Sequence, residues 1–368
     1  MKRVLYIGGF ELPDKNAAAL RVMENAKLLR EMGFETSFIG ITKNVDQAPA
    51  EVEGFPSSPI LYPTSILQWF RQILYFVDSQ KIVDLKPDYV VLYNFPSIAS
   101  LKIVRICHKH GIKVIHDLTE WEQTNGKRPR DIIKRIDTYL RMHYSMRKMD
   151  GVIAISRFLY NIYKDEVNTI LMPPTVDLSH KKWNRNRILF SSNPVTLVYA
   201  GSPGSGVKDR LDIVIDAVMK RMNLQLRIIG LTENQYVESF NASHTQYRNI
   251  EFKGRLAHQE AISEVCNADF QMLIRDRNRK NEAGFPTKLV ESMSCGTPVI
   301  ATIFSNIIDY VHDGENGFII DNNHTIDAVL DKVAGMNADD IVRMKRNCID
   351  MKVFDYHYYK SEFEKLFV

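Results

Sequence analysis

Short apolar strands alternate with amphipathic helices along almost the whole chain, and this alternation limits the fold more than any other feature. The first strand, Val4-Leu5-Tyr6-Ile7, is followed by a loop and by a helix expected over about 17–32, whose apolar residues recur with the helical period. Gly33 then stops that helix. Strands this apolar, separated by helices, are typical of a parallel sheet that helices cover on both faces.

The pattern occurs twice, with a polar break between the two runs that includes residues 172–186. The expected strands are 4–7, 35–40, 89–93, 113–117 and 151–156 before the break, and 196–201, 226–230, 250–254, 270–274, 299–302 and 317–320 after it. A chain of 368 residues is more typical of two domains than of one. We therefore predict an α/β fold of two Rossmann-like, doubly wound domains, residues 1–185 and 186–345, facing each other across a cleft where ligands bind.

Composition excludes several classes of protein. The net charge of +4 is too small to indicate a nucleic-acid-binding protein. The 4 cysteines are scattered, and no Cys/His cluster has the spacing of metal ligands, so we expect neither a disulfide framework nor a metal. The chain begins with Lys2-Arg3 and a strand that soon meets Gly8-Gly9, which is not a signal-peptide pattern, and it has no apolar run of membrane-spanning length. These features predict a cytoplasmic protein without a cofactor.

The stretch 282–300, EAGFPTKLVESMSCGTPVI, is the most informative for function. It predicts a Gly/Pro loop, a short helix stopped by Gly296, and an apolar strand. Gly284 lets backbone N–H groups approach an anion, and the helix directs its positive dipole end to the same place. Lys288 and Glu291 lie one turn apart on that helix. These groups suit a phosphate-linked ribose, although an ordinary helix–strand unit with a surface ion pair explains the same residues.

The chain resembles a retaining glycosyltransferase of family four (glycosyltransferase group 1), which has the two-Rossmann-domain GT-B fold. The resemblance covers nearly the whole length and rests on the order and spacing of seven pieces. These are the Gly8-Gly9 loop, the strand 150–156, the interdomain segment 172–177, Tyr199-Ala200-Gly201 with Lys208-Asp209, the strand end Phe252-Lys253-Gly254, the block 286–300, and the turn Asp313-Gly314-Glu315-Asn316-Gly317-Phe318.

The resemblance implies roles for individual residues. Glu291 matches the second carboxylate of the family's paired-glutamate motif, which binds the ribose, and Lys208 matches a lysine that contacts the donor diphosphate. The first glutamate of the pair falls on Ala283, eight residues before Glu291, so Glu282 is a candidate to replace it near the transferred sugar. The family's arginine after Gly201 is replaced by Ser202, and Arg275 either supplies the missing charge or lies in a solvated basic loop. The expected donor-binding residues are Gly8, Gly9, Gly201, Ser202, Lys208, Arg275, Ala283, Gly284, Phe285, Pro286, Thr287, Lys288, Leu289 and Glu291.

The expected catalytic residues are His116, Asp117 and Glu282. His116-Asp117 ends an apolar strand, where such sheets carry catalytic groups, and the pair suits hydrogen bonding to sugar hydroxyls or acid–base work. A role in satisfying buried backbone groups is equally consistent. Gly8-Gly9 suits close approach by a phosphate, and a turn that requires a positive φ explains one of the two glycines equally well.

Two features of the first half concern the acceptor. Residues 65–77, SILQWFRQILYFV, are apolar nearly all round at helical spacing, which indicates either a helix in the N-terminal core or an interfacial helix that dips into lipid. Lys127, Arg128, Arg130, Lys134 and Arg135 form either a solvated basic face or a site for anionic headgroups or a lipid-linked phosphate. The sequence thus allows peripheral contact with the inner face of the membrane.

The resemblance implies an enzyme of the hexosyltransferase type that moves a sugar from a nucleoside diphosphate, most commonly UDP in this family, to a hydroxyl of a saccharide or lipid-linked saccharide with retention. Polysaccharide or glycan biosynthesis is the expected setting. A non-catalytic GT-B partner subunit and a nucleotide-sugar epimerase or hydrolase are the alternatives. Residues 346–368 carry many rings that a solvated tail would not need, and the fold implies that this last helix packs back on the N-terminal domain.

Overall fold

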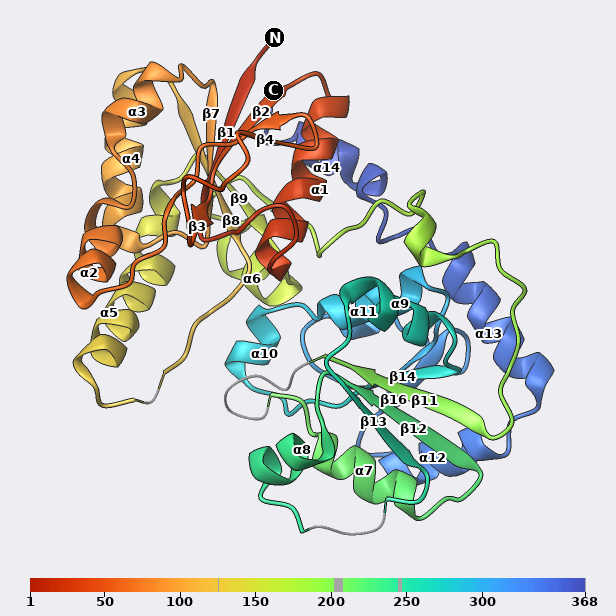
Figure 1. The fold of residues 1–368 in the computed structure, drawn as a ribbon. Coiled ribbons are helices and arrows are strands. Elements are labelled where there is room, and N and C mark those ends of the chain that lie inside the picture. The colour runs from red at the N-terminus through yellow and green to blue at the C-terminus, as the bar shows by residue number, and fades with distance from the viewer. Residues whose placement is uncertain (125, 202–207, 244–246, 368) are drawn as a thin grey trace. The chain divides into compact units, whose positions relative to one another are not determined.

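The computed structural model describes residues 1–124, 126–201, 208–243 and 247–367 (Figure 1). The chain forms two compact units. Unit 1 contains Met1–Val176, Glu282–Phe285 and Asp355–Val368, and unit 2 contains Asp177–Asn281 and Pro286–Phe354. Each unit is built around one six-stranded sheet, as the alternation of strands and helices predicts.

Unit 1 has six parallel strands in the order β10-β9-β8-β7-β1-β2. They are β1 (Arg3–Gly8), β2 (Glu35–Ile39), β7 (Tyr89–Tyr93), β8 (Lys113–Leu118), β9 (Gly151–Ala154) and β10 (Thr169–Leu171). Short pairs β3 (Ile41–Thr42) with β6 (Ile60–Leu61) and β4 (Glu51–Val52) with β5 (Phe55–Pro56) lie between β2 and β7 in the chain. The strand order changes direction between β1 and β7, so the loops after these strands are where a ligand is expected.

Alternate residues of each strand in unit 1 enter opposite cores. Val4 and Tyr6 of β1 pack with α1 (Ala17–Glu31), whereas Leu5 and Ile7 pack with α4 (Ser97–Lys109) on the other face. The remaining helices are α2 (Ile66–Tyr75), α3 (Ser79–Asp84), α5 (Pro129–His143), the 3₁₀ turn η1 (Ser145–Lys148) and α6 (Arg157–Tyr163). The interpretation of residues 65–77 as a core helix is wrong, because α2 has no buried residue and lies on the outer side of α4.

The C-terminal segment of the chain completes the core of unit 1. It consists of η4 (Tyr356–Tyr359) and α14 (Lys360–Glu364), and α14 lies beside α1 in Figure 1. Tyr359, Phe363 and Phe367 are buried in the same apolar cluster as β1 and α1. The Tyr356 hydroxyl donates to Glu31 Oε1 at 2.7 Å, and its backbone N–H donates to Val176 O at 3.2 Å.

Unit 2 has six parallel strands in the order β13-β12-β11-β14-β15-β16. They are β11 (Val195–Ala200), β12 (Leu224–Ile229), β13 (Ile250–Gly254), β14 (Phe270–Leu273), β15 (Val299–Thr302) and β16 (Gly317–Ile320). The helices are α7 (Leu211–Met219), α8 (Glu233–Phe240), α9 (His258–Cys266), α10 (Arg279–Ala283), α11 (Thr287–Ser294), α12 (Ile326–Ala334) and α13 (Ala338–Asp350), with the 3₁₀ turn η3 (Ile307–Asp309). The last two residues of α10, Glu282 and Ala283, belong to unit 1. The strand order changes direction between β11 and β14.

Unit 2 begins at Asp177, earlier than the boundary expected near residue 185. The 3₁₀ turn η2 (Lys181–Trp183) packs against α9, and Trp183 is buried. Its indole N–H donates to Asp177 O at 2.7 Å, and its own carbonyl accepts from Cys266 Sγ at 3.5 Å. These contacts attach the polar segment after residue 176 to the second sheet. Within the described residues, no helix is both long and apolar enough to cross a membrane.

Candidate functional site

A cluster of charged side chains lies in unit 2 at the point where the strand order reverses. Lys208 and Asp209 come from the connection after β11, Arg275 follows β14, and Lys288 is in the first turn of α11. Because β11 and β14 are parallel neighbours, their carboxyl ends bring these side chains to one edge of the sheet. This is the edge at which doubly wound sheets bind ligands.

Asp209 holds the cluster together. Its carboxylate accepts from the Tyr199 hydroxyl at 2.8 Å and forms ion pairs with Arg275 Nε and Lys288 Nζ. The Lys288 ammonium also lies 4.0 Å from the centroid of the Tyr199 ring. Burial alone would raise the pKa of Asp209, but the adjacent Lys288 and Arg275 lower it to about 2, so the carboxylate stays ionised.

The cations outnumber the carboxylate. Lys208 is in no ion pair with any residue in the described part of the chain, and burial together with the charge of Arg275 lowers its pKa to about 8. Burial and the Arg275 charge also lower the pKa of Lys288 to about 8, against the pull of Asp209. Three cations around one carboxylate leave excess positive charge that is partly buried from solvent. An anion with several oxygens would relieve that excess.

Gly201 at the end of β11 leaves room for this arrangement. Its φ is +138°, and a Cβ there would lie 2.4 Å from Lys288 Cε. Any side chain at this position would therefore displace Lys288 from Asp209. Gly201 thus keeps the cluster accessible and fits the expected donor-site role, while Ser202 lies outside the described residues.

A cavity of about 720 Å³ adjoins the cluster, and Glu291 lines it. Its walls come from the carboxyl ends of β11 and β12 and from α8 and α9. Burial raises the pKa of Glu291 to about 7, although Lys182 and Lys288 oppose the shift. Other residues that line the cavity include Leu231, Gln235, Arg255, His258 and Ile262. A cavity of this size, with a carboxylate at one side and cations beside it, matches the shape and charge of a nucleoside diphosphate.

The two N-terminal glycines differ in their surroundings. A Cβ on Gly8 would lie 2.7 Å from Tyr93 Cβ, so Gly8 allows β1 and β7 to pack closely. A Cβ on Gly9 would meet nothing within 4 Å, and Gly9 is exposed. Neither glycine has a positive φ, so the expected left-handed turn is wrong for both. Only Gly9 has the open space that a ligand would need.

The structure does not support His116 and Asp117 as groups that touch a substrate. Both are fully buried in β8. Asp117 accepts from Tyr6 Oη at 2.6 Å and pairs with Arg21, whose Nε lies 2.9 Å from its Oδ1. Burial, with a smaller effect of Arg141, lowers the pKa of His116 to about 3 and keeps the ring neutral. The predicted catalytic role of His116 and Asp117 is therefore corrected to a structural one, because neither side chain reaches solvent.

The loop that carries the expected sugar-side residues divides between the units. Glu282–Phe285 pack with unit 1, where the buried Ala283 accepts a hydrogen bond from Ser156 Oγ at 2.8 Å through its carbonyl. Ala283 thus holds the chain in place and offers no polar side chain, whereas Glu282 is half-buried. Of the other expected residues, Gly284 and Thr287 are partly exposed, and Phe285, Pro286 and Leu289 are buried. Leu289 lies fully within the protein and is a packing residue.

Asp209 and Tyr199 were not among the expected site residues, although both lie in a segment that carries the family resemblance. The signal for Asp209 was its place directly after Lys208, at the end of the connection that returns to the sheet edge. The α8 and α9 residues that line the cavity had no signal of their own, since ordinary amphipathic helices carry them. Within the described ranges, no group of three His, Cys, Asp or Glu side chains is placed to hold a metal ion.

Comparison with known proteins identifies the class. Residues 185–350 match the family model described as glycosyl transferases group 1. An uncharacterized glycosyltransferase of Methanocaldococcus jannaschii is 26% identical over 287 residues, which cover 73% of this chain and 72% of that protein.

Solved structures agree in fold. A sucrose-phosphate synthase of Thermosynechococcus elongatus superposes with a TM-score of 0.73 and 13% identity over 100% of this chain and 98% of that one. HepE of Anabaena in complex with UDP does so with a TM-score of 0.66 and 15% identity over 100% and 99%. The fold is therefore that of the GT-B glycosyltransferases, with two Rossmann-like domains. Residues 185–350 are thus similar in sequence to the group 1 glycosyltransferases, and the whole chain shares the GT-B fold.

Proposed function

We propose that this glycosyltransferase moves a sugar from a nucleoside diphosphate to a hydroxyl of a saccharide or lipid-linked saccharide, with retention of configuration. The observation that carries the proposal is the Asp209 cluster next to the cavity lined by Glu291. Lys208, Arg275 and Lys288 suit the diphosphate, and the Glu291 carboxylate suits the ribose hydroxyls. UDP is the donor nucleotide we expect, and HepE of Anabaena, which has a similar fold, was solved in complex with UDP.

The cations contribute most as the donor bond breaks. The bond between the sugar C1 and the β-phosphate oxygen breaks, and negative charge grows on the leaving diphosphate, where Lys208, Arg275 and Lys288 stabilise it. The acceptor oxygen bonds to C1 on the face that the diphosphate leaves, and the acceptor proton passes to a phosphate oxygen. This route gives retention without a protein nucleophile or a protein base, which accords with the burial of His116 and Asp117.

Glu282 is the residue we propose for the transferred sugar. Ala283 occupies the position at which the resemblance implies a carboxylate, and its buried methyl group cannot bond a hydroxyl. Glu282 is the nearest carboxylate in the sequence and is half-buried. For Glu282→Gln we expect sugar transfer to fall. UDP binding should be kept, because UDP does not carry the transferred sugar.

The site is tested by nucleotide binding to Glu291→Ala and Lys208→Ala. Loss of a hydrogen bond to a charged group costs about 1.5–3 kcal/mol, so the Kd for UDP should rise by roughly ten- to a hundredfold in each variant. Titration calorimetry measures it, after a panel of UDP-, GDP- and ADP-sugars has established the preferred base. Asp339→Ala, an exposed carboxylate on α13, is the matched control and should bind as the unaltered protein does. An unchanged Kd in folded Glu291→Ala would refute the assignment.

Transfer and hydrolysis assays separate the alternatives. Sugar transfer in the presence of acceptor, with retained anomeric configuration in the product, supports the proposal. Donor turnover without acceptor at the same rate would favour a hydrolase or an epimerase on this fold. Donor binding with neither activity would favour a non-catalytic partner subunit in polysaccharide or glycan biosynthesis. A peripheral position at the membrane would suit a lipid-linked acceptor.

A further inference from the structure

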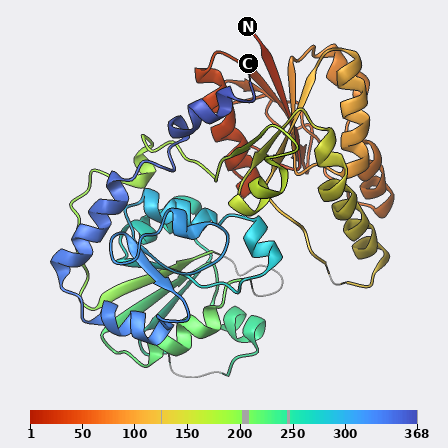
Figure 2. The same cartoon turned by 180° about the vertical axis from the view of Figure 1, so that it is seen from behind.

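Two neighbouring helices of unit 1 leave apolar side chains exposed. Both α2 and α5 pack against α4, and they lie side by side in the opposite views of Figures 1 and 2. Their exposed apolar residues include Ile66, Leu67 and Phe70 of α2 and Ile132, Ile136 and Tyr139 of α5. We call these six residues the α2–α5 face. Leu67 is 78% exposed and Tyr139 64%, values that are high for such large apolar side chains.

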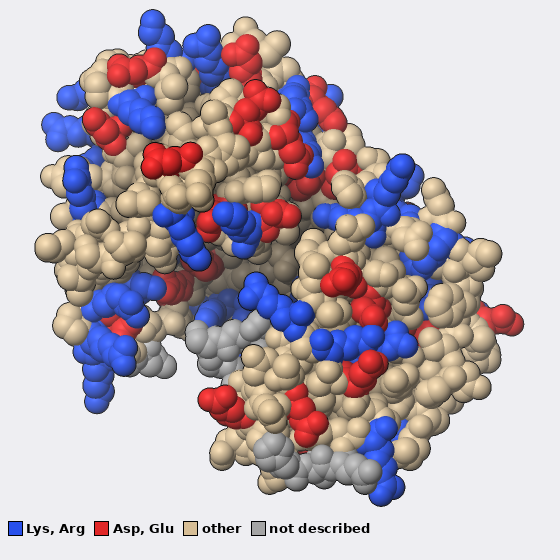
Figure 3. All heavy atoms as spheres, in the orientation of Figure 1, with Lys and Arg blue, Asp and Glu red and all other residues tan. Residues whose placement is uncertain are grey.

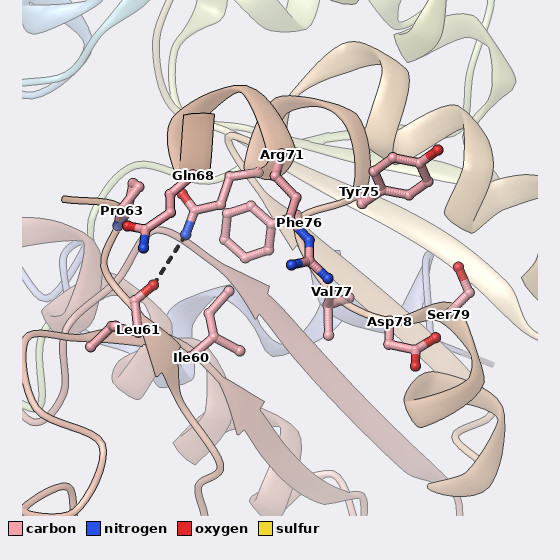
Figure 4. Close-up of a pocket in the computed structure, with 11 residues that line it drawn as sticks. Ile60, Leu61, Pro63, Gln68, Arg71, Tyr75, Phe76, Val77, Asp78 and Ser79 are labelled. Carbon is pink, nitrogen blue, oxygen red and sulfur yellow. Dashed lines mark hydrogen bonds between the residues drawn. The ribbon is translucent and has the colours of Figure 1, made fainter. Parts of the chain in front are cut away.

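The α2 helix is amphipathic, and the exposed Ile66, Leu67 and Phe70 belong to its apolar side. Its other side borders a hollow of about 870 Å³ that Leu61, Phe76 and Val77 line (Figure 4). The helix is tied across this hollow by Gln72 Nε2, which donates to Leu61 O at 3.3 Å. The Arg71 side chain points from α2 towards the 77–78 segment in Figure 4. The side of α2 that borders the hollow carries Gln68, Arg71, Gln72 and Tyr75, so the hollow does not account for the exposed Ile66, Leu67 and Phe70 on the apolar side.

The α5 helix has a clear division between its faces. Ile132, Ile136 and Tyr139 recur at intervals of four and three residues, so they form one exposed stripe. Thr138, Arg141 and Met142 face the protein and are buried. Arg135 is exposed beside the stripe, between Ile132 and Ile136 in the sequence, and Arg130 is exposed in the first turn of α5. In Figure 3, Lys and Arg gather at the end of unit 1 where α5 lies, beside an uncharged area over α2.

The cations around this face are available to a partner. Lys127, Arg128, Arg130 and Arg135 pair with no acidic group in the described part of the chain, and all four are exposed. Lys134 differs, because it is paired with Glu122 at 2.8 Å. These four cations have no acidic partner among the described residues and lie in and just before α5, whose exposed stripe is apolar. Such a combination is complementary to a lipid surface, which has anionic headgroups outside and an apolar interior beneath them. That combination favours an anionic bilayer over a protein groove, which would leave most of these charges without partners.

We propose that the α2–α5 face binds the surface of an anionic lipid bilayer, with Leu67, Phe70, Ile136 and Tyr139 entering the headgroup boundary and the surrounding arginines contacting lipid phosphates. The proposal sharpens the expected basic patch: Arg130 and Arg135 bind lipid, whereas Lys134 serves an internal ion pair. Binding is reversible and sensitive to salt, because charge attraction is screened over about 8 Å at physiological ionic strength. The proposal does not depend on the identity of the donor or the acceptor.

The test is co-sedimentation of the full chain with vesicles of phosphatidylcholine alone and of phosphatidylcholine with about one-third phosphatidylglycerol, across a salt series. We expect pelleting with the anionic vesicles that falls as salt rises, and little with neutral ones. Each basic residue near an anionic surface contributes about fivefold in affinity, so Arg130→Gln with Arg135→Gln should weaken binding roughly thirtyfold. Leu67→Glu with Ile136→Glu should abolish it.

Matched controls keep the test decisive. Ile308→Glu alters an exposed apolar residue of unit 2, and Arg346→Gln with Lys352→Gln removes two exposed cations there. Both should pellet as the unaltered chain does, and UDP calorimetry on every variant reports a failure of the donor site separately. Equal pelleting with both lipids, no pelleting at low salt, or equal binding by face and control variants would overturn the proposal. Light scattering tests one more alternative. If the face variants change oligomeric state but bind vesicles as the unaltered chain does, the proposal is overturned and the face is an interface with a second copy of this chain.

Discussion

Each of the two sheets has a buried aspartate that pairs with an arginine and a tyrosine, but the two clusters have different consequences. In unit 1, Asp117 accepts from Tyr6 and Arg21, and Arg21 Nη1 also donates to Met172 O at 3.1 Å. Every member is buried, and one cation balances one carboxylate. In unit 2, Asp209 accepts from Tyr199 and pairs with both Arg275 and Lys288, and Lys208 adds a third cation.

The comparison shows that net charge and access, more than residue type, separate a structural cluster from a binding site. A balanced and fully buried pair has no capacity left for a ligand, and breaking it leaves an unpaired charge inside the protein. An unbalanced cluster beside a cavity has positive charge that an anionic ligand can neutralise. Sequence position alone suggested the opposite for unit 1, because His116-Asp117 ends a strand just as a catalytic pair would.

The largest expected effect comes from removing the segment that completes unit 1. Deletion of residues 355–368 would take Tyr356, Tyr359, Phe363, Leu366 and Phe367 out of the core. A buried side chain of this kind contributes about 1.5–3 kcal/mol, so the loss is comparable to the whole stability of a domain. We expect unit 1 to lose cooperative unfolding, while limited proteolysis leaves a fragment of unit 2.

Point variants in the same segment give a graded version of this prediction. Phe363→Ala should cost about 3–5 kcal/mol, and Tyr358→Ala should leave the melting temperature unchanged because Tyr358 is exposed. A truncated chain that melts at the same temperature as the full chain would contradict the prediction.

Arginine substitutions address the comparison directly. Arg21→Met leaves Asp117 buried with no cation, so the free energy of unfolding in urea should fall by about 3–5 kcal/mol. Arg275→Met leaves Asp209 paired with Lys288, so its cost in stability should be smaller, while the Kd for UDP rises about tenfold or more. Equal losses of stability in the two variants, with UDP binding unchanged in Arg275→Met, would show that both clusters are structural.

The smallest expected effect is a dependence of donor binding on pH. Burial raises the pKa of Glu291 to about 7, so its carboxylate is ionised and accepts from ribose hydroxyls only above that pH. Burial lowers the pKa of Lys208 and Lys288 to about 8, so both lose charge above it. The association constant for UDP-glucose should therefore be highest between about pH 7 and 8 and fall by up to tenfold per unit below this window.

Calorimetry at a series of pH values measures that profile. Glu291→Gln should remove the decline on the acid side, because the amide does not titrate, and should keep the decline on the alkaline side. A flat profile in the unaltered protein would mean that neither Glu291 nor the lysines contact the donor.

Much of the architecture could be predicted because the signals are local. Every expected strand is present, and the helix expected over 17–32 forms as Ala17–Glu31 with Asn16 as its N-cap. Burial on both faces makes the strands uniformly apolar, and short connections restrict how parallel strands are ordered. Lys208, Arg275 and Lys288 also had local signals, since each follows a strand end or opens a helix of unit 2.

Other features depended on contacts between residues far apart in the sequence. The sequence by itself determined the alternation of strands and helices, the two sheets and the loops that carry the donor-side cations, because these follow from periodicity and from where strands end. Only the tertiary structure decided that Asp117 pairs with Arg21 while Asp209 pairs with both Arg275 and Lys288, and that α2 lies outside the core. The burial of a side chain and the net charge around it depend on all the residues that packing brings next to it. Those residues come from distant parts of the sequence, so no single segment reveals them.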